Sequence, residues 1–224
     1  MKYFTVDYSL ETKIVGTQYP QVWDFIKGYK PELENNGIFS LYQDGFPMNN
    51  PDLSGLKLSN GSKYTDFMSN GFADDLFILS EGAKSLLETM NMEEHRFYQA
   101  NIISLRRKTE KAYYFMKLLS ETFEYVDFNR SSFIIKNQYV GDIRDTIKVN
   151  SFQDFMVKDR EIRNHSKWEY CLQSTSIKML PAFFELRLDL FKISHPIRWY
   201  VSANLFELIH KYKLTGWEFK EVDL

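Results

Sequence analysis

Side chains that commonly do chemistry in proteins are few in this sequence and lie far apart. The chain has 224 residues, with one cysteine and the four histidines His95, His165, His195 and His210. A zinc site would therefore have to gather its ligands from distant segments. The nearest approach to a cluster is Glu93-Glu94-His95, but adjacent side chains point in different directions on a helix or strand. We interpret this triplet as a turn beside a strand and predict no metal site.

The common signatures of catalysis and cofactor binding are missing as well. The ten glycines form neither a phosphate-binding loop nor a dinucleotide fingerprint, and there is no Gly-x-Ser-x-Gly or His-Glu-x-x-His motif. The pair Asp74-Asp75 could serve in acid–base chemistry, although nothing in the sequence singles it out. The single Cys171 excludes an intramolecular disulfide and is expected to behave as a small core side chain. We assign no catalytic or cofactor-binding residue and predict no cofactor, which leaves enzymatic activity open.

One basic cluster, Leu105-Arg106-Arg107-Lys108, precedes an aromatic run at residues 112–116. Basic residues beside aromatic ones occur in proteins that bind single-stranded RNA. Acidic residues lie nearby, however, and the net charge of −2 provides no bulk field that would attract nucleic acid. We interpret the cluster as a solvated turn and predict no nucleic-acid partner.

Two similar segments, residues 77–102 and 199–224, are the clearest structural elements and align without a gap at an offset of 122 residues. Each begins with a short apolar run that ends at a serine, Ser80 or Ser202. Serine is a favourable helix N-cap because its hydroxyl accepts a hydrogen bond from an amide of the first turn. Apolar residues then recur at helical spacing, before a turn near Asn91 or Lys213 and a strand-like tail. We predict two strand–Ser–helix–strand units; the alternative is a chance pattern of the kind that any α/β chain produces.

The remaining segments predict short strands and turns. Strands are expected at residues 2–8, 38–42, 133–136, 146–149, 155–157, 174–179 and 185–191, and a strand or helix of the core at 113–119. Residues 20–26 are ambiguous between a short helix and a loop. Residues 44–71 are rich in turn sequences and predict a long surface loop with room for one strand, a favourable place for binding residues. Residues 158–167 predict a solvated connection, and His195-Pro196 a turn.

Composition predicts a folded protein with a large core. Hydrophobic residues make up 44% of the chain and aromatic residues 17%, which is incompatible with a disordered segment. No linker divides the chain, so we expect a single α+β domain with a mixed or antiparallel sheet and short helices. Asp7 and Glu11 stand where a signal peptide would need an apolar core, and no apolar run approaches the roughly 18 residues of a membrane helix. We therefore expect a cytoplasmic protein that does not associate with membranes.

Three runs of residues carry a family resemblance. They are residues 63–69 ahead of 76–80, residues 113–119 leading to 125–128, and the closing run from Tyr200-Val201-Ser202 to Leu214-Thr215-Gly216-Trp217-Glu218-Phe219. In these runs the chain resembles the bacterial immunity proteins of polymorphic toxin systems, a family first catalogued as a domain of unknown function. Similar proteins end on a Val-Ser, a helix, and a Leu-Thr-Gly before the last strand.

The resemblance implies a non-enzymatic, cytoplasmic protein that binds a cognate bacterial toxin domain and protects the producing cell. It covers residues 63–128 and 183–224. We therefore predict one immunity-protein-like domain over residues 1–224, in which 63–224 carry the likeness and 1–62 have no recognisable match. The resemblance identifies neither the toxin, nor the toxin-binding residues, nor the oligomeric state.

A tight inhibitor interface typically buries about 800 Å² per partner around Trp, Tyr or Arg anchors. Candidate anchors lie in and around the predicted loop, at Tyr42, Phe46, Tyr64 and Phe67. Packing beneath the loop explains these aromatic residues equally well, so we assign none of them as a contact. The alternative function is an enzyme or small-ligand-binding α+β protein, which would show as a deep pocket with converging carboxylates or histidines.

Overall fold

The computed structural model describes residues 2–32, 36–73, 75–120, 122–193 and 197–224. It contains short helices and strands in mixed and antiparallel sheets, so the predicted α+β class is confirmed. The strands are β1 (Tyr3–Tyr8), β2 (Val22–Phe25), β3 (Leu56–Leu58), β4 (Phe67–Met68), β5 (Leu76–Leu79), β6 (His95–Ser104), β7 (Thr109–Leu118), β8 (Ser132–Asn137), β9 (Ile143–Ile147), β10 (Tyr170–Ser176), β11 (Leu190–Ile193), β12 (Arg198–Ser202) and β13 (Trp217–Val222). The α-helices are α1 (Thr12–Val15), α2 (Glu81–Leu87), α3 (Phe152–His165), α4 (Pro181–Glu185) and α5 (Ala203–Lys211), with 3₁₀ helices η2 (Ile38–Tyr42) and η3 (Thr122–Tyr125).

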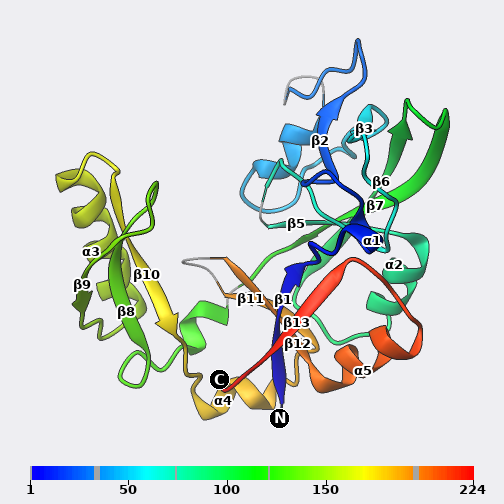
Figure 1. The fold of residues 1–224 in the computed structure, drawn as a ribbon. Helices are drawn as coiled ribbons and strands as arrows, with labels where there is room; N and C mark the ends of the chain where they lie inside the picture. The colour runs from blue at the N-terminus through cyan, green and yellow to red at the C-terminus, as the bar shows by residue number, and fades with distance from the viewer. Residues whose placement is uncertain (1, 33–35, 74, 121, 194–196) are drawn as a thin grey trace.

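The strands form three sheets. A four-stranded sheet has the order β11-β12-β1-β13, a six-stranded sheet the order β2-β3-β6-β7-β5-β4, and a three-stranded sheet the order β10-β8-β9. Neighbouring strands in these sheets run antiparallel, except that β3 and β6 are parallel. Figure 1 shows the three-stranded sheet and α3 as a separate lobe beside the body formed by the other two sheets. Within the described residues, no helix is long and apolar enough to cross a membrane.

Both predicted strand–Ser–helix–strand units are present, as β5–α2–β6 and β12–α5–β13. In each unit the two strands flank a third strand that is antiparallel to both: β7 lies between β5 and β6, and β1 lies between β12 and β13. Helices α2 and α5 bury their apolar faces in one common core. The two units therefore share a topology as well as a sequence pattern.

The capping role of the two serines is confirmed. Ser80 Oγ accepts a hydrogen bond from the Ala83 amide and Ser202 Oγ accepts one from the Leu205 amide, each at 3.2 Å. Each hydroxyl also donates to an aspartate that precedes its unit: Ser80 to Asp66 at 2.7 Å, and Ser202 to Asp189.

Each of these aspartates also holds the turn of the other unit. The Asp66 carboxylate accepts hydrogen bonds from the amide and hydroxyl of Thr215, at 2.9 and 3.0 Å, beyond α5. The Asp189 carboxylate accepts one from the Asn91 amide, at 3.1 Å, beyond α2. We call this reciprocal set of contacts the aspartate clasp, because each aspartate connects the cap of one unit to the turn of the other.

The Leu-Thr-Gly sequence before the last strand has a steric cause. The Phe67 amide donates to the Thr215 carbonyl at 2.9 Å, so β4 runs close to the turn. Gly216 has a φ of 110°, and a Cβ there would lie 1.9 Å from the Phe67 carbonyl oxygen. Only glycine fits a backbone that is both left-handed and this close to another chain segment.

The lobe is packed onto the body through an aromatic core. Phe133 of β8 and Phe155 of α3 belong to the same buried cluster as Tyr3, Phe191 and Tyr200 of the four-stranded sheet. Burying such large rings supplies most of the stabilisation that holds the lobe in place.

Five predictions about local structure were wrong. Residues 38–42 form the 3₁₀ helix η2, and residues 155–165 belong to α3 instead of a strand and a solvated connection. Ser151 caps α3 by accepting from the Asp154 amide, and ion pairs four residues apart, Asp154–Lys158 and Asp159–Arg163, support it. The predicted loop at 44–71 contains β3 and β4 and buries residues such as Leu53 and Leu56.

The fifth error concerns residues 185–191. Pro181 begins α4, Arg187 has a φ of 50°, and only Leu190 and Phe191 lie in β11. Asp189 is buried, and its carboxylate belongs to the aspartate clasp.

Other strands agree with expectation. Residues 2–8, 113–119 and 133–136 correspond to β1, β7 and β8, whereas 146–149 and 174–179 overlap the later part of β9 and of β10. The ambiguous residues 20–26 contain β2, and His195-Pro196 lie outside the described residues.

We predict that Ser80→Ala and Ser202→Ala each lower the free energy of unfolding by about 1 kcal/mol or more, since each removes a helix cap. Ser202→Ala should cost more, because it also withdraws a donor from the buried Asp189. Urea denaturation measures both effects.

The control for the capping variants is Ser54→Ala, an exposed serine outside any helix, which should change the unfolding free energy by less than about 0.5 kcal/mol. Equal stabilities of all three variants would contradict the assigned capping roles.

Candidate functional site

The histidines are not gathered into a site. No group of three His, Cys, Asp or Glu side chains is placed to bind a metal in the part of the chain that the structure describes. His95, His165 and His210 each place Nδ1 within 2.8 Å of a carbonyl oxygen of their own segment. Cys171 is buried in β10, as expected for a core side chain.

Of the candidate acid–base pair Asp74-Asp75, the structure describes only Asp75. Asp74 lies outside the described residues. The Asp75 carboxylate lies 3.6 Å from Lys192 Nζ. The described member of the pair thus has a partner with which it forms an ion pair.

The most buried charged group, Lys117, has a structural role that the sequence did not reveal. Lys117 lies on β7, and its side chain is buried. Its ammonium group donates hydrogen bonds to the carbonyl of Leu41, at 2.8 Å, and to that of Gln43. These carbonyls lie at the C-terminal end of η2, where a cation is favourable. Burial lowers the pKa of Lys117. Alternation along a strand cannot reveal such a role, because the carbonyl acceptors lie more than 70 residues away.

The candidate anchors differ in their availability. Phe67 is fully buried, and Tyr64 stacks on Tyr113 while its hydroxyl donates to the Ile102 carbonyl. Phe46 packs under the guanidinium of Arg96. Tyr42 is 44% exposed, and burial of its hydroxyl raises its pKa to about 12. Only Tyr42 of these four exposes a large part of its side chain.

The basic cluster at residues 105–108 forms the exposed turn between β6 and β7, as predicted. Arg107 donates to the Ser62 carbonyl at 3.1 Å.

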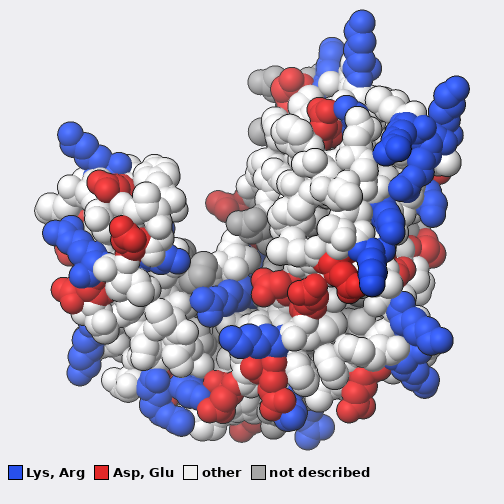
Figure 2. All heavy atoms as spheres, viewed as in Figure 1, with Lys and Arg blue, Asp and Glu red and all other residues white. Residues whose placement is uncertain are grey.

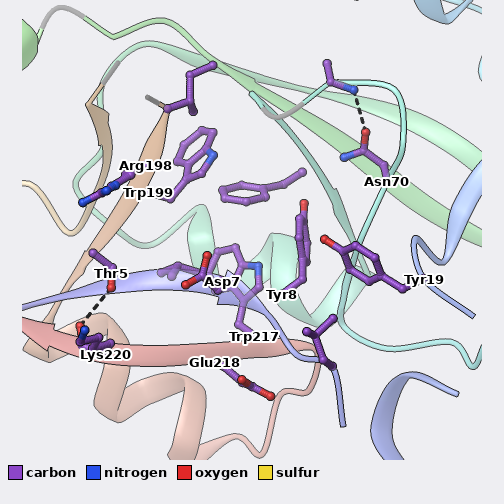
Figure 3. Close-up of a pocket in the computed structure, with 15 residues that line it drawn as sticks. Thr5, Asp7, Tyr8, Tyr19, Asn70, Arg198, Trp199, Trp217, Glu218 and Lys220 are labelled. Carbon is purple, nitrogen blue, oxygen red and sulfur yellow. Dashed lines mark hydrogen bonds between the residues drawn. The ribbon is translucent and has the colours of Figure 1, made fainter. Parts of the chain in front are cut away.

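A large cleft lies where β1, β12 and β13 approach the six-stranded sheet. Its volume is about 790 Å³. Its walls carry five aromatic side chains, shown in Figure 3: Tyr8, Tyr19, Phe77, Trp199 and Trp217. We call this depression the aromatic cleft.

Stacked rings hold the aromatic cleft in shape. The Trp217 ring stacks on Phe67 with centroids 3.7 Å apart, and Phe77 lies between Trp217 and Trp199, with centroid distances of 4.8 and 4.1 Å. Trp199 and Trp217 are 5% and 7% exposed, whereas Tyr19 at the rim is 51% exposed. The walls are therefore rigid and the rim is accessible.

Charges of both signs line the aromatic cleft. Asp7 and Glu218 are exposed and stand directly opposite each other on β1 and β13. Arg198 and Lys220 lie toward the other end of the cleft, and Figure 3 shows the Arg198 side chain extending away from Asp7. Figure 2 shows acidic side chains gathered on this face, with basic side chains beside them. The aromatic cleft therefore presents both carboxylates and cationic side chains at its surface.

Sequence analysis did not identify the aromatic cleft. Its lining comes from five separate parts of the chain, which no local pattern connects: residues 5–8 and 10, residue 19, residues 70, 73 and 77, residues 197–199, and residues 217, 218 and 220. The one sequence signal that could have indicated this cleft is a carboxylate within each of two strands, Asp7 in β1 and Glu218 in β13, which pair in the sheet.

Comparison with known proteins gives one family match. The model of a family described as an immunity protein family (Imm11) matches residues 2–165. This range includes residues 2–62, for which the sequence offered no comparable run, and ends before the closing run at 183–224. No curated protein matches the chain.

We predict that Asp7→Asn leaves the free energy of unfolding unchanged or raises it by up to about 1 kcal/mol, because like charges directly opposite each other on a sheet repel. Thermal and urea unfolding at neutral pH measure the change.

The matched control is Asp24→Asn. The Asp24 carboxylate accepts a hydrogen bond from Lys57 Nζ at 2.8 Å, which lowers the pKa of Asp24, so its neutralisation should destabilise the protein slightly. A clear loss of stability in Asp7→Asn would show that Asp7 has a stabilising partner.

Proposed function

The chain belongs to the Imm11 immunity protein family, and from this premise we propose that it binds and neutralises a cognate toxin domain of a polymorphic toxin system. It acts in the cytoplasm of the producing cell, by contact and not by catalysis. The family match over residues 2–165 is the observation that carries the proposal.

The exposed surface supports a role in binding. Aromatic side chains of the kind that anchor protein interfaces are exposed on both parts of the molecule: Tyr19 and Trp23 on the body, and Tyr139 and Trp168 on the lobe, are each more than half exposed. An inhibitor of standard size covers about 800 Å² of its partner, which is enough to block access of a substrate to a toxin active site.

A second candidate function is the binding of a small molecule, favoured by the size of the aromatic cleft. Its volume of about 790 Å³ falls within the range of ligand pockets, roughly 300–1,000 Å³. A small ligand that raises the melting temperature of the isolated protein would support this function. Such a ligand is not required for toxin neutralisation.

We predict that co-expression of this chain with the toxin encoded beside its gene restores growth, and that the two purified proteins form a stable complex. Growth curves and size-exclusion chromatography measure the two outcomes.

The negative control for rescue is Gly216→Val, which should fail to fold because its side chain would collide with the Phe67 carbonyl. If the wild-type chain neither rescues growth nor associates with the toxin, the proposed function is wrong.

A further inference from the structure

Exposed basic side chains from three separate segments gather along one edge of the body. One comes from α1, one from the segment between β3 and β4, and the others from the hairpin that joins β6 to β7. Figure 1 shows this hairpin extending from the body, and Figure 2 shows basic side chains from the hairpin down toward α1. We call this set the basic strip, and its members are Lys13, Lys63, Arg106, Arg107, Lys108 and Lys111.

Hydrogen bonds between the three segments hold the basic strip together. Lys63 Nζ donates to the Lys13 carbonyl at 2.7 Å, and the Lys63 amide donates to the Val15 carbonyl at 2.8 Å. The guanidinium of Arg107 donates to the Ser62 carbonyl at 3.1 Å. The hairpin and α1 are therefore both fixed to the segment that carries Lys63.

The groups that order these side chains carry no charge. Lys63 and Arg107 donate to carbonyl oxygens, and Lys111 Nζ lies 4.7 Å from the centre of the Tyr64 ring. A carbonyl or a ring positions a cation without neutralising it. Because these side chains are already ordered, a partner that binds them loses less conformational entropy.

The basic strip keeps its positive charge although the whole chain carries a net charge of −2. None of its six members forms a salt bridge with a carboxylate among the described residues. Within two positions of them along the chain there are two carboxylates, Glu11 and Glu110, and Glu110 accepts a hydrogen bond from Asn101 Nδ2 at 2.6 Å. Six cations beside two carboxylates produce a local positive field, which attracts an acidic partner.

The surroundings of the basic strip favour a protein over a nucleic acid as this partner. Proteins that bind single-stranded nucleic acid stack the bases on exposed aromatic rings. The Tyr64 ring is already in contact with Lys111 and stacks on Tyr113, which is 4% exposed. Leu105, in the turn of the hairpin, is 56% exposed and provides an apolar contact of the kind that protein interfaces bury.

On the basis of the proposed function, we propose that the toxin docks on the basic strip through a surface cluster of Asp and Glu side chains. Carboxylates of the toxin accept charge-assisted hydrogen bonds from the arginine and lysine side chains. Complementary charge also steers the two proteins together, so that association is faster than between uncharged surfaces and slows as salt is added.

The first test compares two triple variants that remove the same charge. Arg106→Gln/Lys108→Gln/Lys111→Gln neutralises half of the basic strip, and Lys148→Gln/Arg160→Gln/Lys167→Gln neutralises three exposed cations on the lobe. Stopped-flow measurements with the toxin domain encoded beside the gene give the association rate constant at low and at physiological salt. The strip variant should associate about tenfold more slowly at low salt, with a weaker salt dependence, and the lobe variant within about twofold of wild type. Circular dichroism checks that both variants are folded.

The second test adds positive charge without removing any cation. Glu110→Gln retains an oxygen that can accept the hydrogen bond from Asn101, and it should make association at low salt about twofold faster. A damaged fold cannot produce such a gain, and a rate equal to that of wild type or slower contradicts the proposed docking surface.

The outcomes separate this inference from the proposed function. If the strip variant associates at the wild-type rate, or the lobe variant slows equally, the toxin docks elsewhere and the inference is overturned. If a single-stranded RNA oligonucleotide, and not the toxin, binds the strip variant more weakly than wild type, the strip binds nucleic acid and the inference is likewise overturned. Failure of the wild-type chain to bind the toxin at all would overturn the proposed function and this assignment together.

Discussion

The aspartate clasp is the constraint on which the rest of the structure depends. Asp66 and Asp189 each receive the capping serine of one unit and the turn of the other, so neither helix can move without breaking a contact to the second unit. The main chain repeats this arrangement: the amides of Ser80 and Ser202 donate to the carbonyls of Asp66 and Asp189. Hydrogen bonds to a carboxylate are stronger than those between neutral groups. Two units that are far apart in the sequence thereby become one rigid body.

The same contacts position the aromatic cleft. Thr215 binds Asp66, Gly216 fits against the Phe67 carbonyl, and Trp217, the next residue, stacks on the Phe67 ring. The tryptophan that faces the cleft is therefore fixed by the turn that closes the clasp. A binding surface on rigid strands loses little conformational entropy when a partner docks, which suits a protein that acts by holding its target.

Two features at this site oppose the stability of the protein. Asp7 and Glu218 face each other across neighbouring strands, and the Trp217 indole finds no acceptor in the part of the chain that the structure describes. Both features cost free energy in the isolated protein, and the packing of the aromatic core around Trp217 offsets that cost.

Sequence alone determined the α+β class, the two capped units and the turn of the basic cluster, because periodicity and capping are local properties of consecutive residues. It also provided the family resemblance. It could not determine the structure of residues 38–42 or 185–191, because their hydrogen-bond partners are distant in the chain or in another element. Lys117 donates to the Leu41 carbonyl, and Ser202 donates to the Asp189 carboxylate. Nor could it determine the aromatic cleft, since Asp7 and Glu218 become neighbours only when β1 inserts between β12 and β13. Strand order is decided by long-range packing, and only the tertiary structure reveals which side chains share a surface.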